Sequence, residues 1–194
     1  MEIREVKKSL RAHMKKLREE VDLSLYRTWC NTIMEKCFSL DEWKNATIVH
    51  CYVSALNNEV DTLGLLFAMF DGGKIAAVPK CKPGLHGLMS IRISSLDELL
   101  PSRNGLMEPD YAPDREIRSE RLELVLTPLV AFDRTGRRLG MGGGYYDSFL
   151  AECACPKVGL AYAFQEVEAV PTEPHDSTLD IIITEKEVIR IVNE

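Results

Sequence analysis

Short apolar segments that alternate with helical patterns constrain the fold of this chain most. Segments rich in β-branched and apolar residues predict strands at 46–53, 74–79, 89–93, 122–132, 157–163, 179–184 and 187–192. Between them, 60–70 and a segment from about 145 to 152 have the length and spacing of helices. Strands that alternate with helices usually pair in parallel, because each helix returns the chain to the same edge of the sheet. The sequence therefore predicts an α/β fold with a mostly parallel sheet.

The first 40 residues predict two helices. Apolar residues recur there at steps of three and four, which places one apolar stripe along the first helix. The stripe comprises Ile3, Val6, Leu10, Met14, Leu17 and Val21. The second helix is expected to begin near Asp22 or Ser24, either of which can cap its first turn, and to end near Leu40.

The composition is that of a globular domain and argues against several functions. The 194 residues are 45% hydrophobic and 28% charged, which suffices for one compact core. A net charge of −6 argues against a general nucleic-acid partner. Because no apolar run reaches about 18 residues, no membrane span is expected. We predict a single domain over residues 1–194, with a helical segment over about 1–40 and loops at 80–88 and 101–121.

The six cysteines and four histidines do not have metal-binding spacings. No CxxC pair occurs and the histidines are scattered, so a structural zinc site is not expected. The N-terminal residues lack the apolar core of an export signal. We therefore expect a cytoplasmic protein whose thiols are reduced.

The stretch RRLGMGGGYYDSFL, residues 137–150, is the strongest candidate for a ligand site. Its glycines, at 140 and 142–144, can adopt positive φ and bring bare N–H groups close to a ligand. A helix that begins at Tyr145 or Tyr146 would direct further N–H groups to the same place, which favours an anion such as phosphate. The stretch lacks the P-loop pattern, and Tyr145 stands where a dinucleotide fingerprint has its third glycine. A tight turn without a ligand is the alternative interpretation.

Side chains beside these glycines carry candidate chemistry. Tyr145 and Tyr146 can stack on a flat ring or donate a phenolic hydrogen bond, although at least one of them is expected to pack in the core. Asp147 would lie in the first helical turn, where the dipole alone favours a carboxylate. It is also a candidate Mg²⁺ ligand, since Mg²⁺ is held by one or two carboxylates together with phosphate oxygens. Asp176 and Asp180 are both candidates for a second carboxylate, and the sequence does not choose between them.

Two further candidates lie earlier in the chain. A basic helix face comprises Lys7, Lys8, Arg11 and Lys15. Such a face is usually only solvated, and its functional alternative is recognition of phosphate or carboxylate. Glu59 is expected at a helix start, where it either interacts with the helix dipole or accepts hydrogen bonds from a substrate ring.

Five segments of the chain resemble the 5-formyltetrahydrofolate cyclo-ligase family, also called the 5,10-methenyltetrahydrofolate synthetase family. They are KKSLR at 7–11, NEVDT at 58–62, LMEP at 106–109, LTPLVAFDRTGRRLGMGGGYYDSFL at 126–150 and EPHDSTLDIIIT at 173–184. They follow the family's order, and the resemblance covers nearly the whole chain. It implies a three-layer α/β/α fold similar to the sugar-phosphate isomerase and CoA-transferase group. It also implies an enzyme that uses ATP and Mg²⁺ on a reduced folate with a glutamate tail.

The same resemblance implies residue roles at the matching positions. ATP would be bound by Lys7, Lys8, Ser9, Leu10, Arg11, Arg138, Leu139, Gly140, Met141, Gly142, Gly143, Gly144, Tyr145 and Tyr146. The folate would be bound by Arg11, Glu59, Met141, Gly142, Gly143, Gly144 and Tyr145. Mg²⁺ would be held by Asp147 and Asp176. The implied catalytic residues are Lys7, Arg11 and Tyr145.

In the implied reaction, ATP phosphorylates the formyl oxygen of 5-formyltetrahydrofolate, and N10 then attacks the activated carbon. The products are 5,10-methenyltetrahydrofolate, ADP and phosphate. No enzyme nucleophile is required, so no cysteine is expected to be catalytic, and the protein's task is alignment and charge neutralisation. Two alternatives stay open: a sugar-phosphate or CoA enzyme of the same fold, and a protein that binds nucleotide or folate without turnover. A monomer is expected, and Asp147→Asn is expected to weaken Mg²⁺-dependent turnover more than folding.

Overall fold

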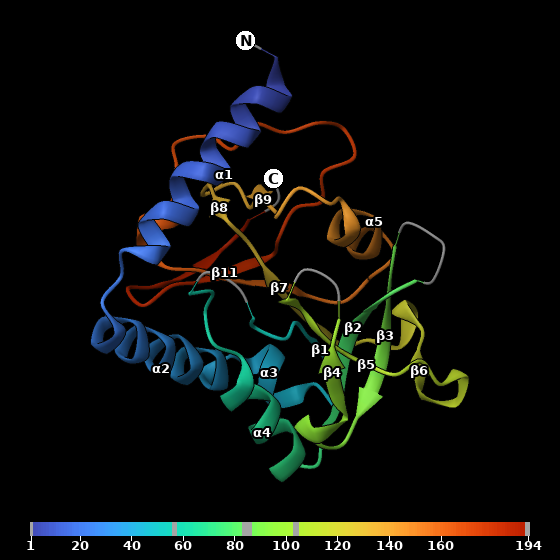
Figure 1. Ribbon diagram of the computed structural model, residues 1–194. Helices are drawn as coiled ribbons and strands as arrows, with labels where there is room; N and C mark the ends of the chain where they lie inside the picture. The colour runs from blue at the N-terminus through green and yellow to red at the C-terminus, as the bar shows by residue number, and fades with distance from the viewer. Residues whose placement is uncertain (1, 56–57, 83–86, 103–104, 193–194) are drawn as a thin grey trace.

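The computed structural model describes residues 2–55, 58–82, 87–102 and 105–192 (Figure 1). Its α-helices are α1 (Ile3–Glu19), α2 (Leu23–Ser39), α3 (Asp41–Asn45), α4 (Leu63–Asp71) and α5 (Tyr145–Ala151). Its strands are β1 (Ile48–Cys51), β2 (Ile75–Cys81), β3 (Leu88–Ile93), β4 (Leu99–Pro101), β5 (Met107–Pro109), β6 (Glu116–Ile117), β7 (Leu124–Pro128), β8 (Ala131–Phe132), β9 (Arg138–Leu139), β10 (Lys157–Leu160), β11 (Ile181–Ile183) and β12 (Val188–Arg190). Short 3-10 helices lie at Leu96–Glu98, Pro113–Arg115, Ser119–Arg121 and Ala163–Gln165. None of the described helices has the length and apolarity that a membrane span requires.

A mixed sheet organises the described residues, with eight strands in the order β12-β11-β10-β7-β1-β2-β3-β6. The five strands from β11 to β2 are parallel, whereas β12, β3 and β6 pair antiparallel with their neighbours. Val49 of β1 lies beside Leu124 of β7 and Ala76 of β2, so these three apolar side chains share one face of the sheet. The prediction of a mostly parallel α/β sheet is confirmed.

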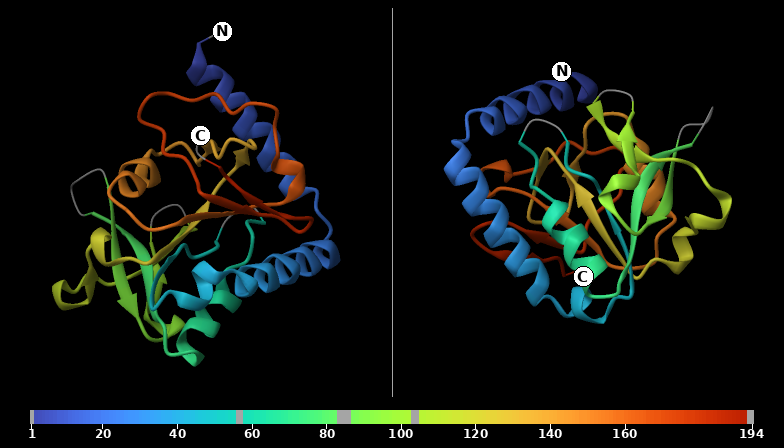
Figure 2. Two further views of the ribbon diagram at one scale, coloured as in Figure 1. Left: turned by 180° about the vertical axis from the view of Figure 1, so that it is seen from behind. Right: turned by 60° about the horizontal axis from the view of Figure 1, so that its bottom comes forward.

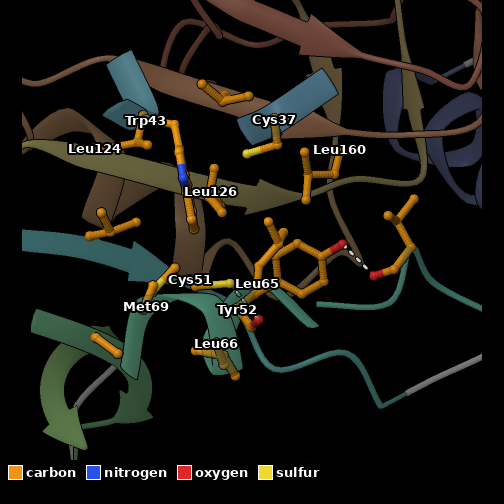
Figure 3. Close-up of a cluster of buried hydrophobic side chains, with 14 of the residues drawn as sticks. Cys37, Trp43, Cys51, Tyr52, Leu65, Leu66, Met69, Leu124, Leu126 and Leu160 are labelled. Carbon is orange, nitrogen blue, oxygen red and sulfur yellow. Dashed lines mark hydrogen bonds between the residues drawn. The ribbon is translucent and has the colours of Figure 1, made fainter. Parts of the chain in front are cut away.

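Helices cover both faces of this sheet (Figures 1 and 2). On one face, α2, α3 and α4 pack on a cluster that includes Val49 and Leu126, part of which is shown in Figure 3. On the other face, Phe149 of α5 packs with Ile48 and Val125. Successive side chains of a strand point to opposite faces, which is why neighbouring residues of β1 and β7 belong to different clusters.

The first helix packs across the chain segment that leads to the glycines. The middle of its predicted apolar stripe is confirmed, because Leu10, Met14 and Leu17 pack with Val130 and Leu139 of the β8–β9 region. Ile3, at the start of the predicted stripe, is exposed. This docking brings the N-terminal helix, over a hundred residues away in sequence, beside the glycine segment (Figure 1).

Helix ends follow the predicted signals in two places. The carboxylate of Asp22 caps α2 by accepting a hydrogen bond of 2.8 Å from the N–H of Ser24. Gly73, with a φ of +69°, follows α4 at the predicted stop. By contrast, Glu59 does not lie at the helix start, because α4 begins only at Leu63, after its N-cap Thr62.

Other predicted bounds also need correction. The predicted strand 122–132 is divided into β7 and β8, since β7 ends at Pro128, which has no N–H to continue a ladder. The predicted loop 101–121 contains β5 and β6, whose two or three residues are too short for a recognisable period. Residues 83–86 and 103–104, which belong to the predicted loops, lie outside the described residues. Helix α3 has only five residues and was not predicted.

The imidazole of His50 on β1 is fully buried between the sheet and α5. Its Nδ1 hydrogen-bonds with Ser90 Oγ at 2.8 Å, and its Nε2 with the Tyr146 hydroxyl at 3.3 Å. Its ring centroid lies 4.6 Å from that of Phe149. Burial lowers the pKa of His50 to about 3, so the ring stays neutral in the folded protein at neutral pH.

We expect His50 to make the protein less stable as the pH falls from about 6.5, the ordinary histidine pKa, towards 3. In that window the unfolded chain binds a proton at His50 and the folded chain does not, which removes about 1.4 kcal/mol of unfolding free energy per pH unit. Urea unfolding of wild type and His50→Gln across this window should therefore give a shallower pH slope for the variant. His13→Gln, on the exposed side of α1, is the matched control and should keep the wild-type slope. Equal slopes for wild type and His50→Gln would contradict the prediction.

Candidate functional site

A cleft of about 1100 Å³ opens at the carboxyl ends of β1, β2 and β7. Ligands of open parallel sheets bind at this edge. The cleft is lined by Arg4, Lys7 and Arg11 of α1, by Tyr52, Val53 and Glu59 after β1, by Pro79, Lys80, Cys81, Lys82 and Leu88 of the β2–β3 region, by Ser102, Leu106, Met107 and Glu108 near β5, by Pro128 and 138–147, and by Glu173, His175 and Asp176.

The glycine segment joins β9 to α5 and forms one wall of the cleft. Gly142 has a φ of +104°, and Gly144 has a φ of +69° and is the N-cap of α5. The Nε of Arg11 donates a hydrogen bond of 2.8 Å to the carbonyl of Gly140. A Cβ built on Gly142 would lie 3.2 Å from the Arg11 guanidinium carbon. Glycine at 142 thus allows both the positive φ and the close approach of α1.

Replacing Gly142 with alanine is expected to impair turnover as well as stability. The left-handed backbone costs a β-carbon about 1–2 kcal/mol, and the added methyl group would also displace the Arg11 guanidinium. Gly73→Ala is the matched control, because Gly73 has a comparable φ of +69° but open space around its Cβ position. Thermal unfolding should show similar stability losses for the two variants, and steady-state kinetics compares their turnover. Only Gly142→Ala should lower kcat/KM, by about tenfold or more. Equal kinetics for both variants would remove the Arg11 contact from the site.

The basic residues of α1 do not share one environment. The Lys7 side chain is buried, and its Nζ lies 2.9 Å from Glu173 Oε2 and 2.6 Å from Asp176 Oδ2. Burial alone would lower the pKa of Lys7, but its hydrogen bonds to Asp176 and Glu173 outweigh burial and raise it. Arg11 is partly buried beside the glycines, and burial lowers its pKa.

The neighbours of Lys7 on α1 point elsewhere. Lys8 and Ser9 are exposed, and Leu10 packs in the cluster under the helix. Of the five consecutive residues predicted to bind ATP, Lys7 and Arg11 therefore line the cleft. Lys15 is half-buried one turn beyond Arg11.

A buried ion pair supports the first turn of α5. Arg138 NH2 donates to Asp147 Oδ1 at 2.8 Å, and the Arg138 side chain is only 1% exposed. Burial lowers the pKa of Arg138, and its Nε has no hydrogen-bond partner among the described residues. Asp147 also accepts a hydrogen bond from Ser177 Oγ at its backbone carbonyl, at 3.0 Å. Arg138 thus holds the Asp147 carboxylate at the cleft, and Asp147 is the only carboxylate with which Arg138 forms an ion pair among the described residues.

The structure separates the two alternative carboxylates. Asp176 lines the cleft, where Glu173, His175 and Asp176 have ligand atoms within 4.8 Å of one another. Asp180 instead accepts a hydrogen bond of 2.8 Å from the N–H of Lys157, at the amino end of β10. Burial would raise the pKa of Asp176, but its hydrogen bonds with Lys7 and the Glu173 N–H lower it.

The two tyrosines also differ. Tyr146 is half-buried and packs against the core beside His50 and Phe149, and burial of its hydroxyl raises its pKa well above the ordinary value. Tyr145 is 37% exposed at the cleft wall. The expectation that at least one tyrosine packs in the core is confirmed. Glu59 is 8% exposed and also lines the cleft.

The cleft contains polar residues that pattern reasoning missed. Glu108 is buried, and its carboxylate accepts hydrogen bonds from the Cys81 N–H at 3.2 Å, Ser102 Oγ at 2.9 Å and Lys80 Nζ at 3.3 Å. Burial would raise the pKa of Glu108, but these hydrogen bonds lower it. Its place in LMEP was the available signal, since nothing in the local periodicity marks it. Glu173 and Arg4 also line the cleft and were missed, because no local periodicity marks them either.

Comparisons with known proteins identify what the chain is similar to. A family model described as the 5-formyltetrahydrofolate cyclo-ligase family matches residues 3–185. A 5-formyltetrahydrofolate cyclo-ligase of Haemophilus influenzae is 30% identical over 182 residues, which cover 91% of this chain and 97% of the relative. The mouse 5-formyltetrahydrofolate cyclo-ligase is 25% identical over 194 residues, which cover 94% of this chain and 95% of the relative.

Solved structures agree with these relatives. The 5,10-methenyltetrahydrofolate synthetase of Aquifex aeolicus superposes with a TM-score of 0.84 at 30% identity, over 97% of this chain and 94% of that one. The 5,10-methenyltetrahydrofolate synthetase of Mycoplasma pneumoniae has a TM-score of 0.74 over 92% of this chain and 98% of that one. At 23% identity, the second likeness shows the fold alone.

Proposed function

Because the chain belongs to the 5-formyltetrahydrofolate cyclo-ligase family, we propose how its cleft performs the family's reaction. The chain is an enzyme with 5-formyltetrahydrofolate cyclo-ligase activity, a ligase of folate one-carbon metabolism, and the family implies an ATP-dependent reaction on a folate. We propose that MgATP and the folate occupy the cleft together, with the γ-phosphorus facing the formyl oxygen. The cleft volume of about 1100 Å³ exceeds that of a typical pocket for one ligand, which suits two.

The observation that carries the proposal is the meeting of cations and carboxylates in one cleft. Lys7, Arg11 and Arg138 supply positive charge, and Asp147 and Asp176 supply carboxylate oxygens. Polyphosphates are bound by such cations and by backbone N–H groups that glycines leave accessible. Two carboxylates near phosphate oxygens form a donor set of the kind that Mg²⁺ prefers. The residues present therefore fit MgATP.

We propose that Asp147 and Asp176 hold the Mg²⁺ ion and that Glu173 keeps Lys7 beside them. When bound, Mg²⁺ supplies neutralisation of the phosphate charge. Lys7 and Arg11 donate hydrogen bonds to phosphate oxygens as charge develops on them, and 142–144 contribute N–H groups. Lys8, Ser9 and Leu10 then support the helix rather than touch the nucleotide through their side chains, a refinement suggested by their positions.

We propose that the folate lies along Glu59 and Tyr145. Glu59 accepts hydrogen bonds from N–H groups of the pterin ring, and Tyr145 stacks on a flat ring, with Met141 beside it. The formyl oxygen then attacks the γ-phosphorus, and ADP leaves. N10 attacks the activated carbon, and the ring closes as phosphate leaves and N10 gives up its proton to solvent. The side chains align these atoms and neutralise charge, and none needs to form a covalent bond with the substrate.

The finer assignments of fold and assembly also belong to this proposal. Helices on both faces of the sheet support a three-layer α/β/α class similar to the sugar-phosphate isomerase and CoA-transferase group. We propose a monomer, since one chain supplies the lining of the cleft. The six cysteines, which lack metal-binding spacing, suit the reducing cytoplasm.

The test follows absorbance in the methenyl-folate band after purified protein is mixed with 5-formyltetrahydrofolate, Mg²⁺ and ATP. The expected result is a rise that requires both ATP and Mg²⁺. Omission of ATP, and separately addition of a metal chelator, are the controls. Calorimetric binding of ATP and folate without a rise would indicate a binding protein and overturn the proposed mechanism. If neither an absorbance rise nor ligand binding is observed, sugar phosphates and CoA esters are the substrates to test next.

A further inference from the structure

Two cysteines follow α5 at the edge of the sheet opposite the cleft. Cys155 lines a second cavity of about 320 Å³, together with Glu42, Ala154, Pro156, Lys157, Asp180, Ile181 and Arg190. This cavity lies at the amino ends of β10 and β11, whereas the cleft lies at carboxyl ends of the parallel strands. The two cavities share no lining residue among the described residues.

The two thiols are in contact but differ in exposure. Cys153 is 5% exposed and packs with Phe149 of α5, whereas Cys155 is half-buried at the second cavity. The thiol of Cys153 donates a hydrogen bond of 3.3 Å to the Phe149 carbonyl, and it also interacts with the Cys155 thiol two residues further along the chain. Its single proton can therefore turn towards Cys155 once Cys155 becomes a thiolate.

The surroundings favour the thiolate at Cys155. The hydrogen bond from Cys153 lowers the pKa of Cys155 despite burial, and the nearby Lys157 ammonium acts in the same direction. The same hydrogen bond, together with burial, raises the pKa of Cys153. A more accessible thiolate next to a protonated buried thiol is the usual arrangement of an attacking and a resolving cysteine.

The walls of the second cavity carry both signs of charge. Arg190 forms a two-pronged ion pair with Glu42, with N–O distances of 2.6 and 3.1 Å, and Lys157 and Asp180 complete the charged lining. A small disulfide that carries both carboxylate and ammonium groups matches such a lining by charge complementarity.

We propose that Cys155 and Cys153 form a dithiol redox site for small zwitterionic disulfides that enter the second cavity. The Cys155 thiolate attacks one sulfur of the disulfide RSSR, so a Cys155–SR bond forms, the S–S bond breaks and RS⁻ leaves. Cys153 then attacks the Cys155 sulfur and gives up its proton as the second RS⁻ leaves as RSH. The two cysteines are oxidised to one disulfide, and RSSR is reduced to two thiols.

The test incubates the reduced full-length chain with oxidised glutathione, traps free thiols by alkylation in acid and maps the products by peptide mass spectrometry. Wild type should yield a Cys153–Cys155 disulfide peptide with little retained glutathione. Cys153→Ser should retain glutathione on Cys155, because the resolving thiol is missing, and Cys155→Ser should lose both products. Cys81→Ser, which removes the half-buried thiol of the cleft, is the matched control and should behave as wild type.

Several results would overturn this proposal. They are glutathione retained by wild type on Cys155 without the disulfide, labelling confined to Cys81, and no reaction at either cysteine of the pair. Thermal unfolding of each variant checks folding, and Cys153→Ala replaces Cys153→Ser if the buried hydroxyl prevents folding. The readout is chemical and does not depend on turnover in the cleft.

Discussion

Replacing Lys7 with methionine is expected to lower ATP-dependent turnover by about two to three powers of ten. Methionine keeps most of the buried stem and removes only the ammonium group, which lies within 3 Å of both Glu173 and Asp176. Without that charge, the cleft loses a donor for phosphate oxygens. The carboxylates of Glu173 and Asp176 also lose the cation that lies between them. The substitution should also raise the pKa of Asp176, because the hydrogen bond from Lys7 is the main interaction that lowers this pKa against the effect of burial.

The control for this prediction is Lys16→Met on the same helix. The Lys16 side chain is 75% exposed and pairs only with Glu20, at 3.8 Å, among the described ion pairs. Kinetics at varied ATP and Mg²⁺, with circular dichroism melting of each variant, separate a catalytic loss from a folding loss. We expect Lys16→Met to match wild type. A Lys7→Met enzyme within a few-fold of wild-type kcat would exclude Lys7 from the phosphate site.

Replacing Asp147 with asparagine is expected to lower turnover by about two powers of ten and unfolding free energy by about 3 kcal/mol. The first effect follows from the proposed Mg²⁺ contact. The second follows because Arg138, whose side chain is 1% exposed, would keep its charge without a counter-ion. The sequence predicts the first effect as the larger one, and the ion pair with Arg138 adds a folding effect of comparable importance.

A double variant separates the two roles of Asp147. Arg138→Met removes the buried charge, so Arg138→Met/Asp147→Asn should recover much of the stability that Asp147→Asn loses. Turnover should stay low in the double variant, because the carboxylate is still absent. Urea unfolding and steady-state kinetics of all four proteins complete the cycle. Additive stability losses would show that the pair is not coupled, and near-normal turnover of Asp147→Asn would remove it from the metal site.

The fold was predictable because its signals are local. Apolar strands and helical stripes have characteristic periods, so the order of the elements could be obtained before any contact was known. Errors occurred where the signal was too short, as in α3, β5 and β6, or where one residue interrupts an apolar run, as Pro128 does. Glu59 was placed at a helix start because the helical pattern was taken to begin at residue 60, whereas the N-cap is Thr62.

The candidate site was predictable only in part. Gly142 and Gly144 stand out in sequence, and Asp147 is marked by its place after them, so this wall of the cleft could be proposed from residues 137–150 alone. Asp176 and Asp180 could not be ranked, because both are carboxylates near a strand start. The structure places Asp176 at the cleft and Asp180 against the N–H of Lys157.

The sequence by itself determined the order of strands and helices and the glycine segment, because backbone preferences and periodicity act over a few residues. Tertiary structure alone decided which side chains meet. Lys7 and Lys8 are adjacent and both basic, and only the docking of α1 on the β8–β9 region turns Lys7 towards Asp176 and leaves Lys8 in solvent. Arg11 likewise reaches the carbonyl of Gly140, 129 residues away, because packed helices and sheets bring together groups that no local pattern connects.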